Sequence, residues 1–139
     1  MHVCNEESSV RGPEDYEEIF RVAAKERANG LLSRLPVALT SSTQRKQLAD
    51  LAAKNHLPAM YETSAYVDDG GLISYGLDRN WRYQRAAVFV DKILKGAKPA
   101  DLPVEQPAKF ELVINLKAAK QIGLTIPQRV LGRANRVIK

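Results

Sequence analysis

The sequence predicts an α/β fold, a mostly parallel sheet flanked by helices. Short apolar runs typical of buried strands alternate along the chain with longer segments whose apolar residues recur at helical spacing. The 139 residues are enough for one sizeable core and hardly for two. Because such strands are joined by right-handed crossovers, we expect helices on both faces of the sheet.

The first half of the chain contains two expected helices and two expected strands. Gly12-Pro13-Glu14-Asp15 begins a helix, with proline at its first position and carboxylates at the positive end of the helix dipole, and Asn29-Gly30 ends it. Ser41-Ser42-Thr43-Gln44 offers a capping box for a helix that runs to about Asn55. Strands are expected over residues 31–35 and 57–61, and a helical turn over 63–69.

In the second half, a strand over 72–75 ends at Gly76, and Gly70-Gly71 before it permits a sharp change of direction. The longest expected helix covers 81–95, and three prolines make 98–107 extended and mostly irregular. A strand over 110–114, a helix over 115–122 and a last helix from Pro127 complete the chain. The inward residues of the two longer helices are expected to be Ala86, Phe89, Val90, Ile93 and Leu94, then Val130, Leu131, Ala134, Val137 and Ile138.

Composition excludes several classes of protein. The longest apolar run, Ala86 to Val90, is far shorter than the roughly 20 residues of a membrane span. The acidic start has no apolar region of a signal peptide, so as written the chain is expected to stay cytoplasmic. Cys4 is the single cysteine, and His2 and His56 are far apart. We therefore expect no internal disulfide, no metal site and no cofactor.

Charge is unevenly distributed along the chain. The first 80 residues hold nine basic and twelve acidic side chains, a net charge of −3, whereas the last 59 hold twelve and four, a net charge of +8. Such asymmetry is one mark of a nucleic-acid surface. The basic residues are nevertheless spaced singly along expected helices and have no interleaved aromatic residues. A solvated helix face is favoured, and nucleic acid is not expected as a partner.

No catalytic constellation is present. The segment 70–76 is glycine-rich but lacks the lysine of a phosphate loop, and Ser74 is not in a nucleophile elbow. An enzyme is therefore not expected. Candidate binding residues instead follow the ends of expected strands, where open α/β sheets bind ligands. They include Pro36, Glu62 and Asp78.

The segments 70–76, 83–107 and 109–127, with Arg11 to Asp15 before them, resemble a known family. They are similar to the C-terminal part of substrate-binding proteins of ABC transporters, whose members include tryptophan and tyrosine transport binding proteins. The resemblance implies a partial type I periplasmic-binding-protein fold, with residues 1–139 as a single α/β unit from a two-lobed protein. It also implies capture of a small solute such as an aromatic amino acid, delivery to an ABC permease, and a periplasmic location.

In this family, loops at strand ends contact the solute. By position the resemblance implies seven ligand-binding residues here: Pro36, Val37, Tyr61, Glu62, Tyr75, Gly76 and Asp78. It also places crossings between lobes at Gly70-Gly71 and in 98–107. Family members often carry an aspartate where this chain has Val37.

Two interpretations of function remain open besides a nucleic-acid binder and an enzyme. The first is a solute-binding protein in which two chains form a homodimer and supply each other's missing strands or helices. The second is a truncated remnant that folds, dimerises and binds nothing, because half of a pocket's polar groups would be absent.

Overall fold

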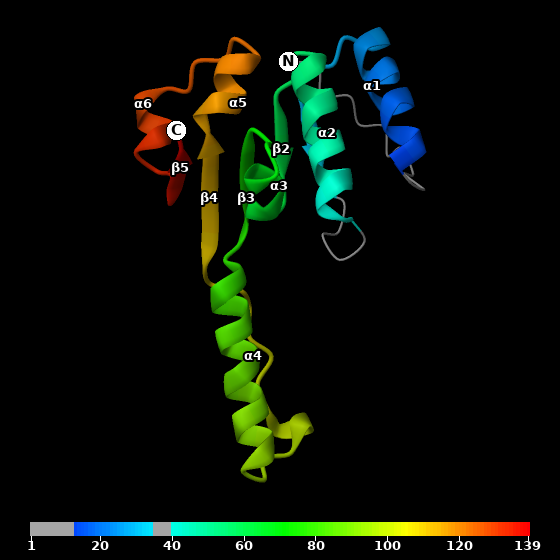
Figure 1. The fold of residues 1–139 in the computed structure, drawn as a ribbon. Coiled ribbons are helices and arrows are strands. Elements are labelled where there is room, and N and C mark those ends of the chain that lie inside the picture. Colours follow the sequence, from blue (N-terminus) through cyan, green and yellow to red (C-terminus); the bar gives the residue numbers. More distant parts are fainter. Residues whose placement is uncertain (1–12, 35–39) are drawn as a thin grey trace.

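Five strands form one sheet in the order β1-β2-β3-β4-β5, and helices pack around it (Figure 1). The computed structural model describes residues 13–34 and 40–139. The strands are β1 (Leu31–Ser33), β2 (Ala59–Tyr61), β3 (Ile73–Leu77), β4 (Phe110–Asn115) and β5 (Arg136–Ile138). The helices are η1 (Pro13–Asp15), α1 (Tyr16–Lys25), α2 (Ser42–Lys54), α3 (Ser64–Asp68), α4 (Arg79–Leu94), η3 (Pro99–Asp101), α5 (Leu116–Gln121) and α6 (Gln128–Leu131).

The sheet is mostly parallel, as predicted. Strands β1, β2 and β3 run in parallel, β4 is antiparallel to β3, and β5 is parallel to β4. The carboxyl ends of β1 to β3 and the first residues of β4 and β5 therefore meet at one edge, which we call the carboxyl edge. Polar groups from both halves of the chain can gather at this edge.

Helices α1, α2 and α3 build the main core against one face of the sheet. Tyr16 and Phe20 of α1 pack in one cluster with Leu48 of α2, Tyr61 of β2 and Tyr66 of α3. The rings of Tyr61 and Tyr66 stack with their centroids 4.8 Å apart. A second cluster of Leu72, Ala118 and Ala119, with Ile122 and Ile126 against it, attaches α5 to the start of β3.

The opposite face of the sheet is open over much of its area. Strand alternation places Leu32, Met60, Tyr75 and Phe110 on this face. Met60 is half-buried, and the side chains of Leu32, Tyr75 and Phe110 are 66%, 52% and 48% exposed. Ile114 on the same face is fully buried. We call the region of Leu32, Met60, Tyr75 and Phe110 the open face.

Helix α4 projects away from the sheet beyond the carboxyl edge (Figure 1). The chain leaves the sheet at Asp78 and returns at Lys109, where the Asp78 N–H donates to the Lys109 carbonyl at 3.1 Å. The returning chain runs beside α4, and Glu105 pairs with Arg85. The spacing of apolar residues predicted an inner side for this helix, and that prediction is wrong: none of its 16 residues is buried.

Two further expectations need correction. The last helix ends at Leu131, and Val137 and Ile138, expected on its inner side, lie in β5. Gly70-Gly71 is not a crossing between lobes in this structure, because it joins α3 to β3. Gly71 packs inside the unit, where a Cβ would lie 2.7 Å from the Tyr61 ring.

Candidate functional site

The carboxyl edge of the sheet contains a polar hollow. Its volume is about 570 Å³, and it is open to solvent. It lies between α3, the start of α4 and the first residues of β4 and β5, so elements from distant parts of the chain form its walls. Its lining residues are Ser64, Asp68, Asp78, Arg79, Asn80, Phe110, Glu111, Asn135 and Arg136.

Charges of both signs face this hollow. Arg136 donates toward Asp68 at 2.7 Å, and its Nε lies 4.0 Å from a Glu111 oxygen. The hydrogen bond to Asp68 raises the pKa of Arg136 above its ordinary value. Desolvation opposes this rise, whereas the negative charges of Asp68 and Glu111 add to it. Among the described residues Arg79 forms no ion pair. Its guanidinium is therefore the cation of the hollow that is not already held by a carboxylate.

Asp78 fixes the first turn of α4 at the rim. Its Oδ1 accepts from the backbone N–H groups of Asn80 at 2.9 Å and Trp81 at 3.2 Å, which is the bonding of an N-cap. These bonds hold the carboxylate in one orientation and place Arg79 immediately beside it. Both bonds use Oδ1, so Oδ2 stays available to a solute.

An aromatic pair adjoins the hollow. The rings of Tyr75 and Phe110 are stacked, with centroids 5.5 Å apart and an interplanar angle of 18°. Phe110 also lines the hollow, whereas Tyr75 extends the pair onto the open face. The site thus combines an apolar aromatic surface with a nearby anion and cation.

The sequence-predicted residues are distributed unevenly around this site. Asp78 lines the hollow, Tyr75 stacks on its wall, and the backbones of Glu62 and Gly76 are in close contact beside it. Tyr61 is 1% exposed and lies in the core, and its hydroxyl has no hydrogen-bond partner among the described residues. Burial, with a smaller contribution from Tyr66, raises the pKa of Tyr61 far above its ordinary value. Pro36 and Val37 lie outside the described residues.

Sequence reasoning missed most of the lining. Arg79 follows Asp78 directly, and Ser64 comes shortly after β2, so the strand-end rule extended by a residue or two would have found both. Phe110, Glu111, Asn135 and Arg136 begin strands rather than end them. They reach the carboxyl edge because β4 is antiparallel to β3, which no local pattern in the sequence shows.

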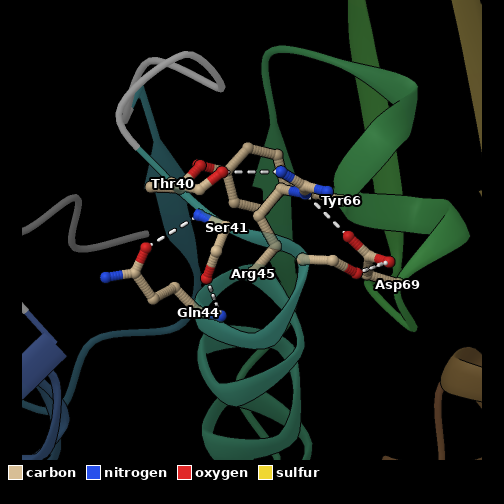
Figure 2. A network of polar contacts seen from close by, with 7 residues as sticks. Thr40, Ser41, Gln44, Arg45, Tyr66 and Asp69 are labelled. Atoms are coloured by element: carbon tan, nitrogen blue, oxygen red, sulfur yellow. Dashed lines mark hydrogen bonds and ion pairs between the residues drawn. The ribbon is translucent and has the colours of Figure 1, made fainter.

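A polar network anchors the start of α2 to α3 (Figure 2). Asp69 accepts hydrogen bonds from Ser42 Oγ and Arg45 Nε, both at 2.6 Å, and Arg45 also donates to the Thr40 carbonyl at 2.7 Å. The Tyr66 hydroxyl lies 3.3 Å from the Thr40 hydroxyl, within hydrogen-bond distance. Burial raises the pKa of Tyr66, and the hydrogen bond with Thr40 opposes that rise. The network holds the loop side of α2 near the carboxyl edge.

Ser41 and Gln44 form the predicted capping box of α2, with bonds of 2.7 and 3.2 Å. Over the residues that the structure describes, no group of three or more His, Cys, Asp or Glu side chains is placed to hold a metal ion. No helix in the same residues is both long and apolar enough to cross a membrane.

The family comparison matches nearly the whole chain. The sequence profile of the family described as ABC transporter substrate binding protein matches residues 6–138. This chain belongs to that family. Its type I periplasmic-binding-protein-like α/β fold agrees with the resemblance stated from the sequence, and members of the family bind substrates for transport. A search among curated proteins found no match.

Solved structures share the fold. A conserved domain protein from Vibrio cholerae matches with a TM-score of 0.79 and 26% identity, over 94% of this chain and 43% of that one. The ABC domain from Streptococcus pneumoniae in complex with L-Trp matches with a TM-score of 0.75 and 28% identity, over 93% of this chain and 44% of that one.

The third structure is a ligand-free, open substrate-binding protein with adhesive properties from Clostridium difficile. It matches with a TM-score of 0.65 and 16% identity, over 94% of this chain and 42% of that one. At this identity the match supports the fold alone. This chain therefore spans less than half the length of these structures.

Proposed function

We propose that this protein is the solute-binding component of an ABC-type uptake transporter and captures an aromatic amino acid or a similar small solute. The observation that carries this proposal is the hollow at the carboxyl edge, where an aromatic pair adjoins an anion and a free cation. The family and the L-Trp complex of a 28% identical neighbour support it. Capture and delivery to a permease need no reaction, so no enzymatic activity is proposed.

The hollow offers a partner for each part of an amino acid. The Arg79 guanidinium suits a carboxylate, because its fork of N–H donors matches two oxygens. The free Oδ2 of Asp78 suits an ammonium group, and the Tyr75–Phe110 pair offers a surface for stacking an aromatic ring. Five other residues remain predicted ligand residues for binding experiments to test: Glu62, Gly76, Tyr61, Pro36 and Val37.

The chain corresponds to the C-terminal portion of a two-lobed protein and acts on the periplasmic side of the membrane, where ABC uptake systems collect solutes. Its partners are the solute, an ABC permease and a second copy of this chain.

The competing function is a folded remnant that binds nothing. The hollow is open to solvent, which favours the remnant, because a site that does not enclose a solute holds it weakly. The two functions differ in a single measurable quantity, the affinity for small solutes.

Titration calorimetry of the purified chain with L-Trp, L-Tyr, L-Phe and non-aromatic amino acids tests the proposal. We expect aromatic amino acids to bind, and a ligand at 100 times its Kd to stabilise the fold by about 2.7 kcal/mol. Arg79→Gln and Tyr75→Ala should each weaken binding at least about tenfold. Arg82→Gln, an exposed arginine in the next part of α4, is the matched control and should not change the Kd.

Binding that is equal in Arg79→Gln and wild type would contradict the site, and no binding of any solute would favour the remnant. Tyr61→Phe separates the core role of Tyr61 from a ligand role. Unchanged affinity is expected for the core role, whereas a clear loss would place its hydroxyl against the solute.

A further inference from the structure

Asn29 and Gly30 form the short link between the end of α1 and the start of β1. Both residues are exposed, and neither lies in a helix or a strand. Because β1 begins directly after them and ends at the carboxyl edge, the link lies at the opposite edge of the sheet. The hollow and the start of α4 are at the other end of the sheet from this link.

The backbone is fixed on both sides of the link. Before it, the Ala28 N–H donates to the Ala23 carbonyl at 2.8 Å, which is the cap bond of a Schellman motif at the end of α1. After it, the Leu31 N–H donates to the Pro58 carbonyl at 2.8 Å and begins the pairing of β1 with β2. The link is therefore a short free stretch between two anchored ones.

The two chemical groups that can react with each other in this link are not held by hydrogen bonds. Among the described residues, the side-chain amide of Asn29 has no hydrogen-bond partner, and the Gly30 N–H donates to none. Gly30 also has no Cβ to shield its backbone nitrogen or to restrict its rotation. This nitrogen can therefore approach the amide carbon of Asn29 and close a five-membered ring.

The other asparagines in the part of the chain that the structure describes are held in place. The side chains of three of them are hydrogen-bonded to backbone groups at 2.8 to 3.2 Å: Asn55, Asn115 and Asn135. The fourth, Asn80, lies in α4, and the N–H that follows it, that of Trp81, donates to Asp78 at 3.2 Å. None of these four is followed by glycine. Asn29 differs from them both in its neighbour and in its freedom.

We propose that Asn29 is a site of spontaneous deamidation that converts the link between α1 and β1 into an isoaspartyl bond. Asparagine is among the thermolabile residues. The Gly30 nitrogen gives up its proton to solvent and attacks the side-chain amide carbon of Asn29. A carbon–nitrogen bond forms, the bond from this carbon to the amide nitrogen breaks, and that nitrogen takes up a proton and leaves as ammonia.

The product of this step is a succinimide ring, which water opens at one of its two carbonyl carbons. Attack at the former side-chain carbon gives aspartate, and attack at the backbone carbon gives isoaspartate, in which the main chain runs through the side chain. Water is the only co-reactant, and no electrons are transferred. The modification belongs to the chain itself and goes beyond the proposed solute binding, on which it does not depend.

An isoaspartate lengthens the main chain by one carbon between two fixed points. The cap of α1 and the first bond of β1 cannot both keep their positions when the link between them is longer. Helix α1 supplies Tyr16 and Phe20 to the main core, so a displaced α1 loosens that core. We therefore expect the modified chain to be less stable than the fresh one.

Peptide mapping of the purified wild type, aged in mildly alkaline buffer, tests the site. Trypsin releases residues 28–34 as one peptide. We expect this peptide to gain the mass difference between an amide and an acid several times faster than the peptides with Asn55, Asn80, Asn115 or Asn135. A methyltransferase specific for isoaspartate, with S-adenosylmethionine as methyl donor, should then methylate the same peptide.

Asn29→Gln keeps an amide at this position, but its longer side chain would have to close a six-membered ring, which forms more slowly. This variant should therefore show neither the mass gain nor the methylation. Asn55→Gln is the matched control, and methylation of peptide 28–34 should be unchanged in it. On ageing, the Tm of the wild type should fall, whereas that of Asn29→Gln should stay at its fresh value.

Circular dichroism and a cooperative melt confirm that each variant is folded before ageing. Equal rates of mass gain at Asn29 and at the other described asparagines, or methylation that persists in Asn29→Gln, would overturn the site. An aged and methylated wild type with the Tm of fresh protein would overturn the effect on α1 and β1. Solute binding is measured on fresh protein, so failure of this proposal and failure of the proposed function are distinguishable.

Discussion

Gly76 brings the backbones of β2 and β3 into contact beside the candidate site. A Cβ at this position would lie 1.7 Å from the carbonyl oxygen of Glu62, far inside van der Waals contact. Only a residue without a side chain permits this approach. The glycine therefore fixes where β2 ends relative to Asp78, two residues further along the chain.

We expect Gly76→Ala to destabilise the fold by several kcal/mol, on the order of the largest single-site effects, because the clash is with backbone that cannot rotate away. Urea unfolding followed by circular dichroism measures it. Gly132→Ala is the matched control: there the nearest atom, the Gln128 carbonyl oxygen, is 3.5 Å from the added Cβ, and the backbone is helical. A change within about 0.5 kcal/mol is expected for the control. Equal effects for the two glycines would show that the close approach is not real.

The position of a single residue at the candidate site could be predicted only where a rule based on its neighbours in the sequence applied. Asp78 follows a strand, the strand-end rule alone predicted it as a binding residue, and it lines the hollow. Phe110 and Arg136 follow no such rule, because they reach the hollow through pairing of β4 and β5 with distant strands. Long-range pairing is the information that residue-by-residue reasoning lacks.

Among the elements, α2 and α3 are joined by the network around Asp69. Asp69 and Arg45 are largely buried, at 20% and 15% side-chain exposure, and Asp69 also accepts from Ser42. Another α2 ion pair, Lys46 with Asp50, is about 63% exposed on each side. The two pairs differ chiefly in solvent access, so they test how much burial contributes.

Asp69→Ala should cost about 1–3 kcal/mol of stability, since it leaves Arg45 without its carboxylate in a poorly solvated position. Asp50→Ala should cost less than about 0.5 kcal/mol, as expected of an exposed pair. Chemical unfolding of both variants gives the comparison. If Asp50→Ala proves the more costly, the network does not anchor α2 to α3.

The ends of the chain show why some elements were predicted wrongly. Helical spacing of apolar residues extended the last helix through Val137 and Ile138, yet Gly132 follows its end and β5 begins at Arg136. Asn135 pairs with Leu112 through two hydrogen bonds of 2.8 and 2.9 Å, which starts β5 against β4. The apolar spacing fits a short strand equally well, and only the available partner strand decides between them.

For the whole molecule, the sequence predicted the α/β class and the family because both depend on order and motif. It did not predict that α4 would lack a core, because its apolar residues have the composition of a buried helix. The elements that pack against a helix depend on the three-dimensional structure, and the spacing of the apolar residues along the helix does not identify them.

Tyrosine burial sets the response of the whole fold to alkaline pH. Burial is the main cause that raises the pKa of Tyr16, Tyr61 and Tyr66, all members of the main core. In the unfolded chain a tyrosine ionises near pH 10. Because the folded pKa values lie above this, the three tyrosines contribute stability that is complete below about pH 10 and is lost as the pH rises beyond it.

We therefore expect part of the tyrosinate absorbance to appear only together with the loss of secondary structure in an alkaline titration. Tyr61→Phe removes the most deeply buried phenol, so this variant should retain its fold to higher pH than the wild type. Its lost hydroxyl has no partner among the described residues, so the substitution itself should cost little. If all tyrosinate absorbance appeared before any change in circular dichroism, the three rings would be reachable by solvent and the core would not be the one described.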